Sequence, residues 1–326
     1  MNPRPSSSER VTLASRGSRL ALAQSERVAA FLRAVRPGLE VEVMVVRTTG
    51  DKDMRPFAQI GGKGLFTSEV ERAVVEGRAD LAVHSAKDLT ADLAPGCVIA
   101  AIPERVSSHD IVIGGRGSTG EERLGTLADG ARVGTSSMRR RALLNETRPD
   151  LEVVEFRGNL DTRLRKVAEG EVDAAILAAA GLERLPDVTE VDAAPLDPGH
   201  WVPAPSQGAL AVEALAERND LLELCRSIDD PDARAQVELE RAFARHLEGG
   251  CSIPLGCLAR SNEPGLVALG YLATPDGLTA LRDRISGGVH EAAALGEELA
   301  AAILQGGGDD ILEDLREQEA PEVVEP

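Results

Sequence analysis

Short apolar segments alternate with amphipathic segments over the first two hundred residues of the chain. The segments with the length and alternation of strands are residues 11–14, 41–46, 81–83, 111–113, 131–133, 151–156 and 174–177. Helices are predicted between them, at residues 68–76, 137–147 and 161–169 among others. Strands that alternate with helices form a mainly parallel sheet with helices on its faces. The sequence therefore predicts an α/β fold with two such units, the second running from about residue 105 to 205.

The C-terminal third of the chain has a different pattern. A long helix is predicted at 231–247, and alternating segments such as 265–272 predict a small α+β domain. Pro203-Ala204-Pro205 is a plausible hinge before it. Residues 305–326 carry eight acids against Arg316, so we expect an acidic, disordered tail. The short, polar residues 1–10 are expected to be disordered as well.

Charge, aromatic content and cysteine spacing exclude several classes of function. The 326 residues have a formal net charge of −18 and 2% aromatics, whereas nucleic-acid binding uses a basic face or aromatic stacking. The N-terminus lacks an apolar signal segment, and no apolar run approaches the roughly 18 residues that span a bilayer. The four cysteines are dispersed without a C-x-x-C pair, which predicts reduced thiols and no metal site. We expect a cytoplasmic protein without nucleic-acid or membrane partners.

Basic residues gather between Arg132 and Lys166, a segment with nine basic and five acidic side chains. It contains Gly134-Thr135-Ser136-Ser137-Met138-Arg139-Arg140-Arg141, which follows a strand and opens a helix, with Thr135 or Ser136 as the predicted N-cap. Amides, hydroxyls and guanidiniums that converge in this way bind carboxylate or phosphate. A solvated basic turn is the alternative. Because the rest of the chain is strongly acidic, we favour a cleft for polyanions.

A second motif, His84-Ser85-Ala86-Lys87-Asp88, lies at the carboxyl end of a short strand, where ligands of open α/β sheets bind. Successive side chains of a strand point in opposite directions, which separates Lys87 from Asp88. Lys87 is therefore free to bind a substrate carboxylate. Asp88 can accept hydrogen bonds from N–H donors and stabilise positive charge on them. A salt bridge at the strand end is the alternative. Gly61-Gly62-Lys63-Gly64 lacks the pattern of a Walker loop and is interpreted as a mobile flap with one cation.

A lone thiol, Cys251, follows a predicted helix and two glycines. Lone cysteines are usually buried small hydrophobes, but Gly249-Gly250 and Pro254 favour a loop here. A thiol in such a loop is a candidate tether if nearby cations lower its pKa.

Together these motifs resemble one family, the porphobilinogen deaminases, also called hydroxymethylbilane synthases. The matching stretches follow the family's order over about residues 11–275: 61–66, 84–88, 134–140, 157–159, 162–164, 180–185, 203–209 and 240–256. Their combination is highly specific, although no single stretch is.

The resemblance implies two domains like those of type II periplasmic-binding proteins and a third, smaller α+β domain. On this sequence we expect them at residues 11–104 plus 205–228, at 105–204 and at 231–304, the last of which carries Cys251. It also implies a monomer with a dipyrromethane cofactor joined to Cys251 by a thioether.

The implied reaction condenses four porphobilinogen molecules head to tail, releases ammonia each time, and ends when water frees hydroxymethylbilane. Each pyrrole carries an acetate and a propionate, for which arginine is the natural bidentate partner. Loss of ammonia leaves an azafulvene with positive character on the ring nitrogen. Asp88 matches the family's catalytic aspartate and would stabilise that charge.

The resemblance also implies a set of site residues. The binders of cofactor and substrate carboxylates are Arg16, Ser18, Lys87, Thr135, Ser136, Ser137, Arg139, Arg140, Arg157, Arg163 and Arg184. Lys63 and Phe66 belong to the mobile loop, and Gln207 and Gly208 line the site from the interdomain crossover.

The sequence departs from the family pattern at Gln59, where many relatives have lysine, and at Ala86, which replaces a common methionine. The alternative function is a non-catalytic two-lobed anion-binding or effector-sensing protein, which needs neither Cys251 nor a third domain.

Overall fold

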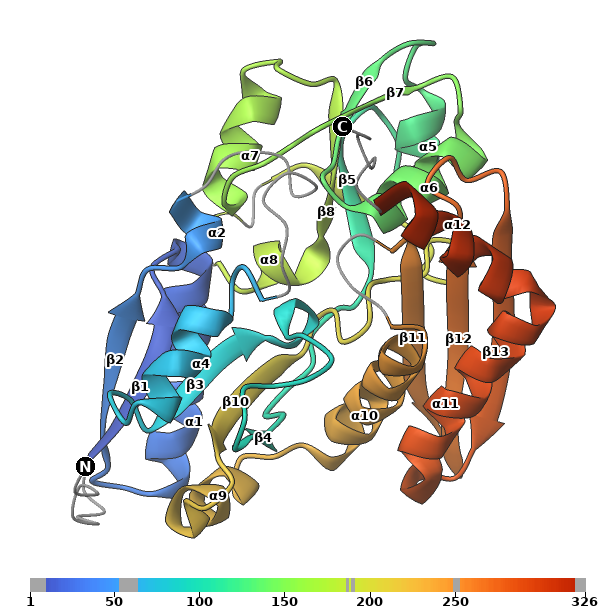
Figure 1. Ribbon diagram of the computed structural model, residues 1–326. Coiled ribbons are helices and arrows are strands. Elements are labelled where there is room, and N and C mark those ends of the chain that lie inside the picture. The colour runs from blue at the N-terminus through green and yellow to red at the C-terminus, as the bar shows by residue number, and fades with distance from the viewer. Residues whose placement is uncertain (1–9, 53–63, 186–187, 189–190, 249–252, 320–326) are drawn as a thin grey trace, which may run out of the picture.

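The computed structural model describes residues 10–52, 64–185, 188, 191–248 and 253–319 (Figure 1). The expectations for residues 1–9, Gln59, Lys63, Cys251 and residues 320–326 fall outside the described residues. No described helix is both long and apolar enough to cross a membrane.

The first lobe is a five-stranded sheet with the spatial order β2-β1-β3-β10-β4. Its strands are β1 (Arg10–Arg16), β2 (Glu40–Val46), β3 (Leu81–Ser85), β4 (Cys97–Ala101) and β10 (Leu210–Leu215). Its helices are α1 (Arg19–Val35), α2 (Thr49–Lys52), α4 (Ser68–Val75) and α9 (Asn219–Arg226). Strand β1 pairs in parallel with β2 and β3, whereas β10 is antiparallel to β3 and β4.

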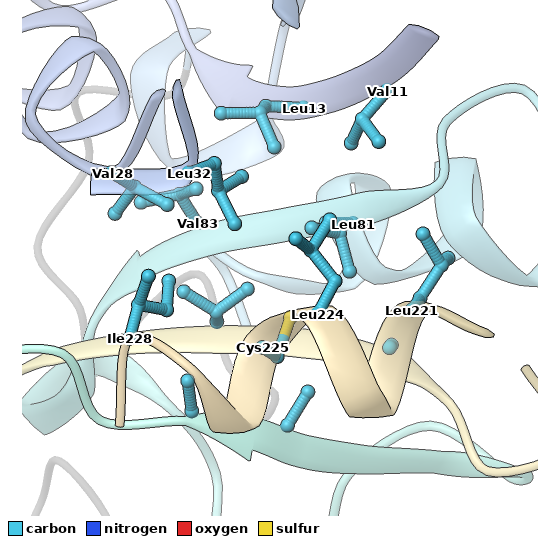
Figure 2. Close-up of a cluster of buried hydrophobic side chains, with 14 of the residues drawn as sticks. Val11, Leu13, Val28, Leu32, Leu81, Val83, Leu221, Leu224, Cys225 and Ile228 are labelled. Carbon is cyan, nitrogen blue, oxygen red and sulfur yellow. The ribbon is translucent and has the colours of Figure 1, made fainter. Parts of the chain in front are cut away.

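Alternation along the strands gives this sheet two apolar faces. Leu13, Leu81 and Val83 lie on one face in a cluster with Val28 and Leu32 of α1. Figure 2 shows Leu221 and Leu224 of α9 completing that cluster. Ala14 and Ala82 lie on the opposite face and pack with α4. Two covered faces bury the inner strands β3 and β10 nearly throughout, whereas the edge strand β2 alternates and exposes Glu40 and Glu42.

The second lobe repeats the plan with the order β7-β6-β8-β5-β9. Its strands are β5 (Asp110–Gly114), β6 (Arg132–Gly134), β7 (Glu152–Val154), β8 (Ala174–Ala178) and β9 (Ala193–Pro195). Its helices are α5 (Gly120–Gly125), α6 (Met138–Thr147), α7 (Leu160–Ala168) and α8 (Ala179–Glu183). In each lobe the strand that arrives from the other lobe, β10 or β5, takes the fourth place and runs antiparallel. The sheets are therefore mixed, with four strands of each in one direction.

The third domain packs two helices on a three-stranded antiparallel sheet. The strands are β11 (Leu255–Asn262), β12 (Gly265–Ala273) and β13 (Ala280–Gly287), and the helices are α10 (Pro231–His246) and α11 (Ala292–Ile303), the latter preceded by the short η3 (Val289–Glu291). Helices α10 and α11 approach closely because residue 296 is glycine; a Cβ there would lie 2.2 Å from the carbonyl oxygen of Leu239. Two lobes of the type II periplasmic-binding-protein kind and a smaller α+β domain are thus present, as the resemblance implies.

The predicted disorder of the acidic tail is wrong for its first part. Residues Leu304–Gly308 form a π-helical turn, η4, and Asp309–Glu319 form helix α12. Ile311 and Leu312 are only 3% and 5% exposed and join the core of the third domain. Acidic residues outnumber apolar residues in this segment, but the apolar residues recur at helical spacing. Burial of the apolar residues stabilises the helix.

Candidate functional site

Asp88 and Arg16 lie at the same edge of the first lobe. Asp88 ends η1 (Ala86–Asp88), which follows β3 directly, and Arg16 ends the parallel neighbour β1. Arg16 Nη1 is 3.8 Å from Asp88 Oδ2, and its guanidinium carbon is 4.2 Å from the centre of the Phe66 ring. The Asp88 side chain keeps about a third of its surface accessible (33%), so it remains open to a ligand. Three predicted site residues are thus brought together.

The buried carboxylate of Asp110 organises the basic motif of the second lobe. Its Oδ2 accepts a hydrogen bond from Arg139 Nη1 at 2.8 Å, and its Oδ1 accepts one from Arg140 Nη2 at 2.7 Å. Oδ1 also accepts from Gln207 Nε2 at 2.8 Å, and Gln207 Oε1 in turn accepts from Lys87 Nζ at 3.1 Å. One carboxylate thereby connects two arginines of the second lobe, the crossover and a lysine of the first lobe.

Charge at this site is dominated by the cations. Burial opposes ionisation of Asp110, but Arg139 and Arg140 outweigh it and hold the pKa of that carboxyl well below its usual range. Lys87 stays exposed, yet the surrounding protein reduces its hydration. This desolvation, reinforced by Arg140, lowers the pKa of the ammonium to about 8. Burial and Arg140 likewise lower the pKa of Arg163 to about 10. For Lys87 and Arg163, desolvation is the larger cause, and the nearby acids, which act in the opposite direction, do not offset it and Arg140.

The hydroxyls before α6 order the turn that carries the arginines. Ser137 is the N-cap, and its side chain accepts from the backbone N–H of Arg140, so the predicted caps Thr135 and Ser136 are wrong. Thr135 Oγ1 accepts from the N–H of Ser137, and Ser136 Oγ accepts from the N–H of Phe156. The cap falls at Ser137 because the hydroxyls of Thr135 and Ser136 are already engaged by the N–H groups of Ser137 and Phe156.

The remaining predicted residues flank this centre. Ser18 caps α1 by accepting from the N–H of Ala21, and Arg157 is buried just after β7. Arg163 lies on α7 and feels the charges of both Arg140 and Asp88. Arg184 stands apart from Asp110 and donates to the carbonyl of Gly208 at 2.7 Å.

The backbone conformation at residue 208 requires glycine. It has φ +89°, and a Cβ there would lie 2.5 Å from the carbonyl oxygen of Val106. The two crossover segments can approach only because this residue has no side chain.

Sequence reasoning missed Asp110 and Glu104. Glu104 Oε1 lies 3.7 Å from Arg184 Nε, and its other oxygen accepts from Arg27. A signal for Asp110 existed: it is an acid placed directly before the apolar strand Ile111–Ile113, where a buried carboxylate requires a cationic partner. No described group of three or more His, Cys, Asp and Glu side chains is arranged to hold a metal ion.

The donors at this site fit a ligand rich in carboxylates. The buried Nε atoms of Arg139, Arg140 and Arg163 have no hydrogen-bond partner among the described residues. Buried donors are normally paired, and carboxylates are the acceptors that suit guanidinium best. Asp88 and Asp110 are outnumbered by the five cations Lys87, Arg16, Arg139, Arg140 and Arg163. Fold and site together define a two-lobed anion-binding protein with an accessible carboxylate beside its cations.

Comparison with known proteins specifies the family. The family model "porphobilinogen deaminase, dipyromethane cofactor binding domain" matches residues 11–223, and the model of the C-terminal domain of porphobilinogen deaminase matches residues 234–305. The porphobilinogen deaminase of Syntrophobacter fumaroxidans is 42% identical over 94% of this chain and 97% of the relative. The porphobilinogen deaminase of Roseiflexus castenholzii is 44% identical over 93% of this chain, and that of Desulforudis audaxviator is 45% identical over 94%. Each match covers 98% of the relative.

Among solved structures, the chain is similar to the VFT2 domain of Bordetella pertussis BvgS. That match has a TM-score of 0.41 and 16% identity, and covers 68% of this chain and 86% of that domain. The chain belongs to the porphobilinogen deaminase family.

Replacing Asp110 by asparagine tests the organising role of this carboxylate. The pKa of Asp110 is lower in the folded state than its unfolded value of about 3.9, so its ion pairs stabilise the fold above that pH and lose this effect as pH falls. At pH 7, Asp110→Asn should lower the free energy of unfolding by about 3–5 kcal/mol. The deficit should shrink below about pH 4 in urea unfolding followed by circular dichroism. A deficit independent of pH would contradict the organising role of the Asp110 carboxylate.

The control is Glu169→Gln, which removes an exposed ion pair with Arg165. It should lower the free energy of unfolding by at most about 0.5 kcal/mol.

Proposed function

We propose that this chain is a hydroxymethylbilane synthase, a transferase of tetrapyrrole biosynthesis. It condenses four porphobilinogen molecules head to tail, releases ammonia at each step, and hydrolyses the product hydroxymethylbilane from a covalently held primer. The observation that carries this proposal is the cluster of incompletely neutralised cations next to the accessible carboxylate of Asp88. Family membership supplies the identity of the substrate.

The arginines bind the acetate and propionate groups of the substrate and the growing chain. Arg139 and Arg140 are held by Asp110 and by the carbonyl oxygens of Val202 and Ile176, while their buried Nε atoms have no partner among the described residues. Because Asp110 fixes both guanidiniums before a ligand arrives, little side-chain entropy is lost on binding. Arg163 and Lys87 add positive charge on either side of the site.

Asp88 stabilises the positive charge that develops on a pyrrole nitrogen as ammonia leaves. Arg16, 3.8 Å away, lies beside the carboxylate of Asp88, whose oxygens can accept N–H hydrogen bonds. A fixed carboxylate beside a developing cation lowers the barrier without reorganisation of solvent. Lys87 has a pKa of about 8, so it is mostly protonated at neutral pH and attracts carboxylates there.

Cys251 carries the dipyrromethane cofactor through a thioether. When bound, this group supplies the ring carbon from which the chain grows. Cys251 lies outside the described residues, so support for this assignment is the sequence motif and the family model for a dipyrromethane-binding domain. We further propose a cytoplasmic monomer without nucleic-acid or membrane partners, in keeping with the net charge of −18.

Intact mass tests the attachment directly. The purified protein should be heavier than its polypeptide by one dipyrromethane, and Cys251→Ala should remove the increment and the activity. Cys97→Ala, which removes a half-buried free thiol elsewhere, should keep both. A wild-type protein of polypeptide mass that still converts porphobilinogen would exclude a covalent primer, whereas a permanently idle protein of that mass would favour an anion-binding function.

Replacing Asp88 by alanine tests the proposed charge stabilisation. Asp88→Ala should keep its circular dichroism spectrum and lose about 10²–10³-fold in kcat for porphobilinogen consumption. Asp129→Ala, which removes an exposed carboxylate in the turn before β6 of the second lobe, should retain wild-type turnover. Equal rates for Asp88→Ala and wild type would rule out the catalytic role of this carboxylate.

A further inference from the structure

Helix α10 of the third domain lies along the segment that follows Asp88. In Figure 1 this helix runs between the first lobe and the sheet β11-β12-β13. Ala233, Val237, Arg241 and Arg245 recur every four residues, so they form one stripe on the helix. The first two pack in one apolar cluster with Ala86 and Leu89, the residues on either side of the Lys87-Asp88 pair.

Further along the same stripe, two arginines hold the next carbonyls. Arg241 Nη2 donates to the carbonyl oxygen of Thr90 at 2.9 Å and to that of Ala91 at 3.1 Å. Arg245 Nη2 donates to the carbonyl oxygen of Ala91 at 3.1 Å. The stripe on α10 therefore contacts the segment 86–91 on both sides of Asp88.

The segment held in this way lies at the surface. Residues 91–95 line two open pockets, of about 410 and 540 Å³, although Leu93 packs against the apolar cluster of Ala86 and Leu89. Segments with few buried contacts open locally at low free energy. Removal of the hydrogen bonds from α10 should therefore loosen this segment before it affects the sheets.

Arg241 also compensates buried acids of the first lobe. Glu213 is fully buried, with its Oε2 3.1 Å from His84 Nε2, and Glu71 is 5% exposed. Burial lowers the pKa of Arg241 and Arg245 lowers it further, while Glu213, Asp92 and Glu71 act in the opposite direction. The guanidinium thus makes two separable contributions, a positive charge toward these acids and a donor fork toward the two carbonyls.

We propose that Arg241 is a positioning residue for the reaction, and that its fork fixes the Asp88 segment to α10. This inference rests on the proposed function. Helix α10 ends at His246, and Cys251 follows five residues later in the sequence. The helix is therefore joined by a short stretch of chain to the cofactor thiol and by contacts to the segment of the catalytic carboxylate. A carboxylate displaced by about 1 Å from the reacting ring loses much of its effect on rate.

A conservative variant separates the two contributions of Arg241. Lysine keeps the positive charge near Glu213 and Glu71, but its ammonium ends a shorter, flexible stem and does not place a donor at the position of Nη2, from which Arg241 reaches both carbonyls. Arg241→Lys should retain its urea midpoint and its cofactor mass. Its amides at residues 89–96 should exchange with deuterium faster than in the wild type. Its kcat should fall about tenfold or more with KM within about twofold, since orientation and not binding is disturbed.

Two further variants complete the experiment. Arg245→Gln, which removes one hydrogen bond to the same segment and an exposed 4.0 Å ion pair with Asp92, should show a smaller change in exchange and in kcat. Arg260→Gln, an exposed arginine of the same domain, should match the wild type in both.

The exchange and kinetic results decide the proposal together. Wild-type exchange at residues 89–96 in Arg241→Lys, or faster exchange with an unchanged kcat, overturns it. Failure of the proposed function is a different result, in which the wild-type protein itself neither carries the cofactor nor consumes porphobilinogen. Amide exchange is measured without substrate, so it reports on the fork in either case.

Discussion

The ion pairs of Asp110 with Arg139 and Arg140 are the interaction on which the site depends. Two buried guanidiniums on adjacent residues repel one another, and each loses hydration on burial. A single carboxylate of zero exposure makes that arrangement possible, yet it leaves a net positive charge and unpaired Nε donors. The fold thereby holds the two guanidiniums in place at the cost of a repulsion, which the carboxylates of the substrate would relieve under the proposed function.

The three domains meet where the chain crosses between lobes. Arg105, on the first crossover, makes a bidentate pair with the buried Glu240 of α10, with distances of 2.8 and 3.0 Å. The same carboxylate accepts from the N–H of Ser206 on the second crossover and from that of Ala259 in β11. Gln207 follows Ser206 and reaches Asp110. The anion site, the crossovers and α10 are therefore connected by a short series of buried polar contacts.

Sequence patterns predict part of this arrangement. Apolar runs place β1 to β3 and β5 to β8 but miss β4, β9 and β10, and strand-end motifs place Asp88 and the arginines at the site. The direction of β5 and β10 could not be predicted, because a strand buried on both faces has the same composition whichever way it runs. The tail was misjudged because its acids outnumber Ile311 and Leu312, although only the buried residues decide whether α12 packs. The partners of Asp110 and the carbonyl contacts of Arg241 lie on distant segments, so no local pattern contains them, although the acid before an apolar strand is itself a local signal.

The central claim is that the cationic site holds an oligomer that grows while it stays attached to the protein. Rapid mixing with limiting porphobilinogen, followed by denaturation and intact-mass analysis, tests this most directly. The account predicts a ladder of protein masses that rises in equal steps of one pyrrole unit above the cofactor-bearing form. Complete conversion of the substrate while the protein mass stays constant throughout would contradict it.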